Sequence, residues 1–84
     1  MAHPAPVLEV AAIVDARGLS CPMPIVKTAL AVKGVPSGSL IEVLATDPGS
    51  TKDFTAWCRS TGHDLVEDSF TPETRVYRYL IRRK

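Results

Sequence analysis

The 84-residue chain lacks the features that mark several large classes of protein. It has two cysteines, one tryptophan, 6% aromatic residues and a formal net charge of only +1. So few cysteines cannot build the disulfide framework of small secreted domains, and the near-neutral charge gives no global attraction to nucleic acid or anionic lipid. No apolar run reaches the roughly 18 residues that span a bilayer, and Met1 to Pro6 carry no export signal. We therefore expect a cytoplasmic protein with two free thiols and no membrane association.

What the chain does contain is enough aliphatic sequence for one small core. Hydrophobic residues make up 45% of the chain, and its length suits one domain without a deep internal cavity. Two prolines and the absence of apolar periodicity predict a flexible tail over residues 1–6, followed by a single domain over residues 7–84. Any chemistry is therefore expected at the surface.

Apolar periodicity predicts six elements in the order βαβαββ. Short, partly β-branched apolar segments predict strands, and apolar residues at three- and four-residue spacing predict helices. The expected strands are Leu8–Val14, Leu40–Thr46, Leu65–Phe70 and Val76–Arg82, and the first expected helix is Pro22–Lys33. Right-handed crossovers that move the same way place both helices on one face of the sheet. The predicted fold is a two-layer α/β sandwich.

The second expected helix follows the second strand and ends at Gly62. Its core-facing stripe consists of Phe54, Trp57, Cys58 and Thr61. The N-cap is either Asp47, which precedes a proline, or Ser50, which has capping-box spacing, and the sequence leaves both open. The stripe favours a buried structural role for Cys58.

Alternation along the last strand predicts which of its side chains face the core. Tyr77, Tyr79 and Ile81 share one face, which we expect to point inward. The opposite face is more polar and is expected to point outward. That outward face comprises Val76, Arg78, Leu80 and Arg82.

The most informative segment is Cys21-Pro22-Met23-Pro24, which lies between a strand-ending loop and the first helix. Prolines are tolerated in the first turn of a helix because its amides have no intrahelical acceptor. We therefore expect Cys21 to be the N-cap, with its sulfur at the positive helix end and its thiol pKa modestly below about 8.5. No histidine lies between Asp15 and Ile25 to act as a base. A purely structural role for Cys21, as a helix cap, stays open.

Three cationic residues, two of them near this segment in sequence, are candidates for docking or for stabilising the thiolate. They are Arg17, Lys27 and Lys52, and each also fits an ordinary solvated surface charge. A Cys2His2 metal site is disfavoured because its members lack paired ligand spacing. Those members would be Cys21, Cys58, His3 and His63. No metal or cofactor is expected.

The segment Asp15–Pro24 resembles the signature of TusA-like sulfurtransferases, which contains a CPxP motif. Further segments resemble the second helix and the last strand of that family, namely Thr46–Ser50, Lys52–Phe54, Trp57-Cys58 and Tyr77–Arg82. The resemblance extends from Ile13 to Arg83. It implies a mixed four-stranded sheet in the order 1-2-4-3, similar to the C-terminal domain of translation initiation factor three.

The resemblance also implies a sulfurtransferase in which Cys21 carries a sulfane sulfur as a persulfide, supported by Arg17, Gly18, Pro22 and Pro24. The donor would be a cysteine desulfurase or a rhodanese-like protein, and the acceptor would be a thiol of another sulfur-relay protein. The pathway stays open between tRNA 2-thiouridine modification, sulfur oxidation and molybdenum cofactor assembly. A second relay role for Cys58 also stays open. The free protein is expected to be a monomer.

RNA binding is the alternative from a different class of function, because the C-terminus is basic and contains tyrosines. Against this alternative, Tyr77 and Tyr79 are expected to face the core, and the sequence contains no RNA-recognition motif. We therefore expect no direct contact with nucleic acid. A regulatory interaction module without thiol chemistry is the remaining alternative.

Overall fold

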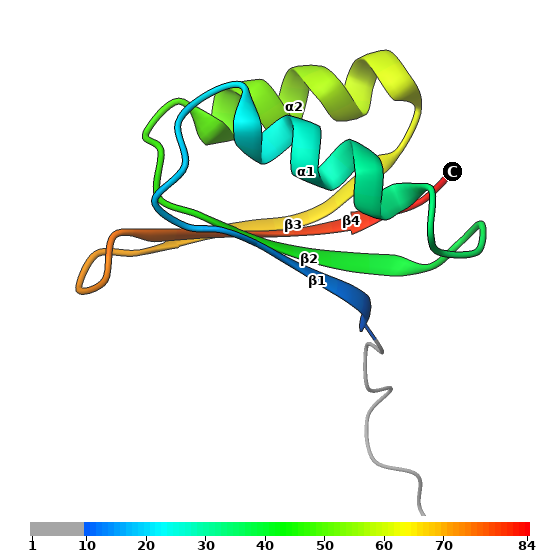
Figure 1. Cartoon of the computed structure of the whole chain (residues 1–84), viewed down its shortest axis with the longest axis horizontal. Coiled ribbons are helices and arrows are strands. Elements are labelled where there is room, and N and C mark those ends of the chain that lie inside the picture. Colours follow the sequence, from blue (N-terminus) through cyan, green and yellow to red (C-terminus); the bar gives the residue numbers. More distant parts are fainter. Residues whose placement is uncertain (1–9) are drawn as a thin grey trace, which may run out of the picture.

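The computed structural model describes residues 10–84, which form a four-stranded sheet with two helices on one face (Figure 1). The elements are β1 (Val10–Ala16), α1 (Met23–Val32), β2 (Leu40–Ala45), α2 (Ser50–Thr61), β3 (Asp64–Thr71) and β4 (Val76–Arg82). The predicted βαβαββ order and two-layer architecture are confirmed. The predicted tail over residues 1–6 and the predicted strand start at Leu8 lie outside the described residues.

The strands are ordered β1-β2-β4-β3, with β1 parallel to β2 and the other two pairs antiparallel. This is the mixed sheet that the family resemblance implied. Because β1 and β2 are parallel neighbours, their carboxyl ends lie at the same edge of the sheet. The loops that lead to α1 and α2 both start there, so the two helices begin at the same end of the molecule, which also holds the β3–β4 turn (Figure 1).

The core lies between the sheet and the helices and is centred on aromatic rings. Tyr79 and Phe54 are fully buried, and their stacked rings have centroids 4.7 Å apart. Ile81 is also fully buried, and Tyr77 packs against the core while remaining half-buried. The Tyr79 hydroxyl lies 2.6 Å from Ser50 Oγ, so the buried polar groups satisfy each other. The predicted inward face of β4 is therefore confirmed.

Leu80 lies on the outward face of β4, as predicted, yet it is only 2% exposed although neither helix packs on that face. Its cross-strand neighbours are Glu42 on β2 and Glu67 on β3. Both carboxylates form ion pairs with Arg78, which lies two residues before Leu80 on the same face. We infer that this ion-paired cluster covers Leu80, so this residue is buried although it lies on the outward face, as predicted.

Several predicted element ends were wrong by one or two residues. β1 continues past Val14 to Ala16, β2 ends at Ala45, β3 is one residue longer at each end, and α1 spans Met23–Val32. The N-cap of α2 is Gly49, so neither of the two predicted caps was correct. Gly62 ends α2 in the left-handed conformation, with φ of 84°, as predicted. No helix within residues 10–84 has the length and apolar character needed to cross a membrane.

Candidate functional site

Cys21 lies in the β1–α1 loop, immediately before the first turn of α1, and is exposed. The N-cap of α1 is Pro22, so the predicted N-cap was wrong by one residue. No side chain caps α1, and backbone bonds close this turn instead. Met23 N donates to Ser20 O at 2.9 Å, and Val26 N donates to Pro22 O at 3.0 Å. The Cys21 thiol is therefore not needed to cap the helix.

The two prolines of the motif lie in different environments. Pro24 is buried in the first turn of α1, where its missing amide costs no helical hydrogen bond. Its carbonyl oxygen accepts a 2.9 Å hydrogen bond from the hydroxyl of Thr28, which is fully buried. Pro22 is exposed, and the Cys21–Pro22 peptide bond is cis. Pro24 thus anchors the start of α1 directly beside the exposed thiol.

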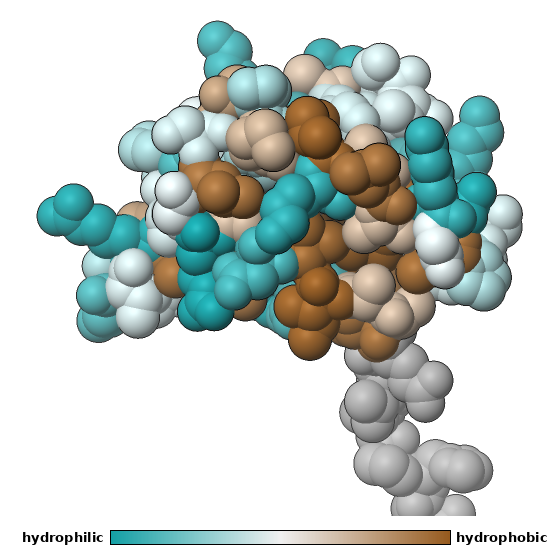
Figure 2. Space-filling model, in the orientation of Figure 1, coloured by the Kyte–Doolittle hydropathy of each residue, from teal (hydrophilic) through white to brown (hydrophobic). Residues whose placement is uncertain are grey.

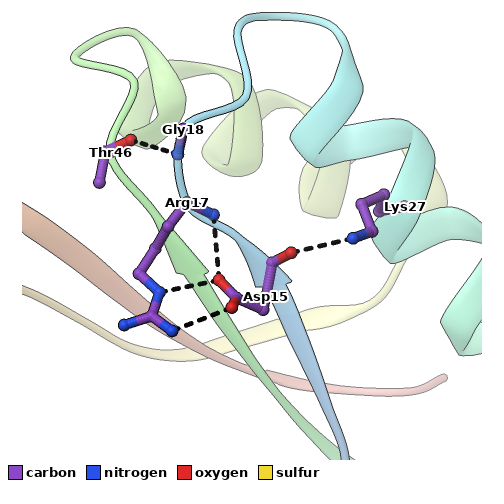
Figure 3. A network of polar contacts seen from close by, with 5 residues as sticks. All are labelled: Asp15, Arg17, Gly18, Lys27 and Thr46. Carbon is purple, nitrogen blue, oxygen red and sulfur yellow. Dashed lines mark hydrogen bonds and ion pairs between the residues drawn. The ribbon is translucent and has the colours of Figure 1, made fainter.

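Polar contacts hold the loop that leads to Cys21 (Figure 3). Gly18 has φ of 79°, a left-handed conformation that glycine adopts without strain. Its amide donates a 2.8 Å hydrogen bond to Thr46 Oγ1, which lies just after β2. Lys27 Nζ donates to the backbone carbonyl oxygen of Asp15 at 2.9 Å and so ties α1 to the end of β1. These bonds fix the loop between two strands and a helix.

Arg17 pairs with Asp15 rather than with the thiol (Figure 3). Its Nε and Nη2 donate to the two carboxylate oxygens at 2.8 and 2.9 Å, and its amide donates to one of them at 3.1 Å. These hydrogen bonds lower the pKa of Asp15 to about 2. Arg17 and Lys27 are thus both engaged with Asp15, while Lys52 is exposed in the first turn of α2.

Carboxylates, rather than cations, dominate the electrostatics of the Cys21 thiol. Hydrogen bonding to Asp53 raises the pKa of this thiol, and desolvation and the charges of Asp53 and Asp47 raise it further. Carboxylate oxygens of Asp47 and Asp53 lie close to Gly49. A β-carbon added to this glycine would be 3.5 Å from the Asp47 oxygen and 4.0 Å from the Asp53 oxygen. Both carboxylates therefore flank the start of α2. The predicted lowering of the thiol pKa was wrong, because hydrogen bonding to Asp53, desolvation and the two carboxylate charges raise it instead.

Sequence reasoning missed Asp53 as a neighbour of Cys21 because the two residues lie far apart along the chain. The topology held a usable signal. Parallel neighbouring strands bring the loops that follow them to the same sheet edge, and Asp53 follows β2 as Cys21 follows β1. The Gly18–Thr46 hydrogen bond is direct evidence that these two loops lie side by side.

Cys58 has the opposite environment from Cys21. It is 4% exposed and belongs to the core on the inner side of α2, as its helical stripe predicted. Burial, with a smaller contribution from Asp64, raises the pKa of this thiol to about 11. Cys58 therefore remains a neutral thiol at physiological pH and is screened from solvent.

Of the two histidines in these predictions, His63 is described by the structure, and it lies at the opposite end of α2 from the Cys21 loop. His63 follows the far end of α2, where its Nδ1 accepts the amide of Lys84 at 3.0 Å and its ring lies 5.1 Å from that of Trp57. Residues 10–84 contain no group of three or more potential metal ligands, and His3 lies outside the described residues.

A surface groove of about 470 Å³ opens beside the loop that follows β2. Its lining consists of Thr46, Pro48, Phe70, Pro72, Arg75 and Tyr77. The rings of Phe70 and Tyr77 pack with centroids 4.6 Å apart, which leaves Tyr77 half-buried. Tyr79 is fully buried and cannot stack on an RNA base. The tyrosines thus give little support to RNA binding.

Comparisons with known proteins agree with this geometry. The family model for "Sulfurtransferase TusA" matches residues 12–83. Sulfur carrier protein TusA of Allochromatium vinosum is 41% identical over 69 residues, covering 82% of this chain and 88% of that protein. Sulfur carrier protein TusA of Pseudomonas paraeruginosa is 40% identical over 84 residues, covering 100% of this chain and 98% of that protein.

A solved structure supports the fold independently. The SirA-like protein from Desulfitobacterium hafniense matches with a TM-score of 0.74 at 21% identity, covering 84% of this chain and 95% of that chain. The sequence matches span almost all of the described residues and include the loop, the thiol and both helices. The chain therefore belongs to the TusA family of sulfurtransferases.

Proposed function

We propose that the protein is a sulfur carrier that holds a sulfane sulfur as a persulfide on Cys21. The observation that carries this proposal is the exposure of Cys21 at the start of α1, in a chain whose other thiol is buried. A sulfur that is passed between proteins must be reachable by a donor and by an acceptor, which an exposed loop thiol permits. The relatives named sulfur carriers support the same role.

In the loading step, Cys21 Sγ attacks the terminal sulfur of a donor persulfide. A new S–S bond forms on Cys21 while the S–S bond of the donor breaks, and the donor leaves as a thiol. In the unloading step, an acceptor thiol attacks the same terminal sulfur and regenerates the Cys21 thiol. Each step consumes one persulfide and forms one, so neither step needs an oxidant or a reductant.

The partners in these steps are proteins that present a persulfide or a thiol. We propose a cysteine desulfurase or a rhodanese-like protein as donor, and a relay thiol of a tRNA 2-thiouridine or sulfur-oxidation pathway as acceptor. Met23, Val26 and Leu30 are 44%, 40% and 64% exposed on α1, directly after Cys21. Figure 2 shows apolar side chains gathered over α1 and the edge of the sheet at β1. Such a surface beside a nucleophile suits transient docking, with Lys52 as a candidate docking charge.

The proposal is tested by loading the protein with a cysteine desulfurase and cysteine and measuring its intact mass. We expect wild type and Cys58→Ser to gain about 32 Da for each sulfur atom, and Cys21→Ser to gain nothing. Loading of Cys21→Ser at the wild-type rate would reject Cys21 as the carrier. Labelled sulfur delivered from the loaded protein to candidate relay proteins would then identify the acceptor.

A further inference from the structure

We propose that the surface groove beside the loop after β2 binds an extended segment of a protein that exchanges sulfur with Cys21. The segment places an apolar side chain against the rings of Phe70 and Tyr77 and a carboxylate on Arg75. The inference rests on the proposed function of Cys21 and deepens it, because it names the kind of partner segment that the protein recognises.

The groove of about 470 Å³ lies between the β2–α2 loop and the β3–β4 hairpin. Its lining residues are Thr46 and Pro48 from the loop, with Phe70, Pro72, Arg75 and Tyr77 from the hairpin. Thr46 Oγ1 accepts the 2.8 Å hydrogen bond from the amide of Gly18, which precedes Cys21 by three residues. The groove therefore adjoins the loop that carries the thiol, at the end of the molecule where both helices begin (Figure 1).

The groove is apolar where the hairpin extends beyond the two helices (Figure 1). Phe70 and Tyr77 are cross-strand partners on β3 and β4, so their side chains lie on the same face of the sheet. This face also carries the fully buried ring of Tyr79, yet Phe70 is 46% exposed. A second, smaller hollow of about 240 Å³ borders the same two rings. An exposed aromatic pair beside two hollows is a surface that an extended apolar segment can bury.

The charge of the groove indicates what else the segment carries. Arg75 alone among the six lining residues is charged. Its side chain is exposed and forms no ion pair with any other residue between positions 10 and 84. The guanidinium is therefore free to bind a carboxylate through two parallel hydrogen bonds.

The smaller hollow has the opposite charge. It is lined by Asp68, which is exposed and, within the described part of the chain, also without an ion-pair partner. A carboxylate on the segment is therefore attracted to Arg75 and repelled from Asp68. The same acidic residue disfavours the phosphate backbone of RNA across the two rings, so charge favours a peptide as the occupant.

The backbone of Arg75 supports a role for its side chain. Its φ of 57° is the one left-handed conformation of a non-glycine residue within residues 10–84. Its amide closes the hairpin turn by donating to Thr71 O at 2.8 Å. Glycine or asparagine adopts this conformation with less strain, so the turn itself does not require an arginine. A strained residue at the rim of a groove is typical of a position constrained by function.

The test is a nuclear magnetic resonance titration of the full-length, ¹⁵N-labelled protein with synthetic peptides. One hexapeptide contains leucine, serine and a central aspartate, and its matched control has asparagine in place of the aspartate. Both are acetylated and amidated, so that their termini are uncharged. We expect saturable shifts at the amides of Thr46, Phe70, Arg75 and Tyr77. The aspartate peptide should bind about three- to fivefold more tightly than its control, as an exposed ion pair allows.

Substitutions separate the charge from the rings. Arg75→Asn suits the left-handed backbone and should remove the preference for aspartate, and Arg75→Glu should reverse it in favour of a peptide with a central lysine. Phe70→Ala should weaken both peptides by about tenfold. Arg59→Gln is the matched control, because it neutralises an exposed arginine in the last turn of α2 and should change no affinity.

Four results would overturn the proposal. They are equal affinity of wild type for the aspartate and asparagine peptides, an unreversed preference in Arg75→Glu, shifts confined to Met23, Val26 and Leu30 on α1, and tighter binding of a uridine oligonucleotide than of the aspartate peptide at the groove.

Loading of the wild-type protein by glutathione persulfide, without peptide, tests the proposed function separately. Loading at Cys21 without peptide binding would reject the groove as a docking site. Peptide binding without loading would instead reject the proposed function.

Discussion

One cysteine lies in a loop and the other inside a helix, and different physical effects control their thiols. Cys21 is exposed before α1, and the carboxylates of Asp53 and Asp47 contribute to the rise of its pKa. Cys58 is 4% exposed within α2, and burial raises its pKa to about 11. Both pKa values move in the same direction. Exposure and the origin of the shift therefore separate the candidate carrier from the core thiol, whereas the direction of the shift does not.

The difference between the two thiols shows which of their environments can be changed by substitution without disturbing the core. Charges beside Cys21 can be removed, or compensated by a partner, without disturbing the core. The environment of Cys58 can change only if the packing around Phe54 and Tyr79 changes with it. The site at the start of α1 thus combines a rigid support with an adjustable electrostatic environment.

The largest expected effect comes from removing the exposed thiol. Cys21→Ser should abolish sulfur loading, because its hydroxyl cannot form a persulfide, while the melting temperature stays close to that of wild type. Stability should be retained because the residue is exposed and no side chain caps α1. Intact mass after donor treatment and thermal denaturation check the two parts. A large fall in melting temperature would show that Cys21 has a structural role.

The matched substitution of the core cysteine should lower stability and leave sulfur loading largely intact, the reverse of Cys21→Ser. Cys58→Ser places a hydroxyl in a packed apolar site and should lower the free energy of unfolding by roughly 1–3 kcal/mol, with sulfur transfer largely retained. Denaturant titration and loading assays measure these quantities. Unchanged stability combined with lost transfer would instead make Cys58 a second relay thiol.

The raised pKa of Cys58 gives this prediction a pH dependence. In the folded protein the neutral thiol is favoured. The contribution of Cys58 to the free energy of unfolding is therefore fully present below the unfolded pKa and is lost as pH rises from about 9 to about 11. The stability of wild type relative to Cys58→Ser should therefore fall across that window. A difference that stays constant from pH 8 to pH 11 would contradict the burial of this thiol.

A smaller effect is expected in the loop that supports Cys21. Gly18→Ala should cost about 1 kcal/mol, because φ of 79° is strained for a residue with a β-carbon, even though that carbon would have no neighbour within 4 Å. Gly34→Ala is the control, since its φ is not left-handed and its β-carbon would make an ordinary 3.5 Å contact. Denaturation midpoints compare the two. Equal effects would argue against the loop conformation described for Gly18.

The smallest effect concerns the exposed ion pair between Arg17 and Asp15. With its pKa lowered to about 2, Asp15 contributes stability above its unfolded pKa of about 4, and that contribution is lost as pH falls from about 4 to about 2. Arg17→Ala should flatten the pH dependence of stability in this window and leave the alkylation pKa of Cys21 unchanged. Acid denaturation followed by circular dichroism measures the first part. Identical acid profiles would contradict the pairing of Arg17 with Asp15.

Much of the fold could be predicted from the sequence because its signals are local or follow from chain topology. Apolar periodicity marked both helices, the stripe placed Cys58 in the core, and Gly62 marked the end of α2. Right-handed crossovers placed the two helices on one face of the sheet. The boundaries were less accurate because terminal residues are decided by hydrogen bonds, as at Gly49 and Pro22.

What could not be predicted depends on contacts between residues far apart in the sequence. The helix end predicted a lowered thiol pKa for Cys21, whereas Asp53 on the neighbouring helix reverses the direction. Leu80 has an outward position in its strand, yet ion pairs from β2 and β3 lie around it. Arg17 is adjacent to the motif in sequence, but its side chain pairs with Asp15. In each case the environment of the residue depends on a neighbouring side chain, and only the strand register and the loop packing identify that neighbour.

Peptide mapping of a single sample can show whether Cys21 is the thiol that carries sulfur. Wild-type protein is briefly exposed to a cysteine desulfurase with cysteine, trapped by alkylation, digested and analysed by mass spectrometry, before and after an acceptor thiol is added. We predict about 32 Da of added sulfur on the Cys21 peptide, lost when the acceptor is added, and none on the Cys58 peptide. Sulfur found only on Cys58, or sulfur on Cys21 that no acceptor thiol removes, would contradict it.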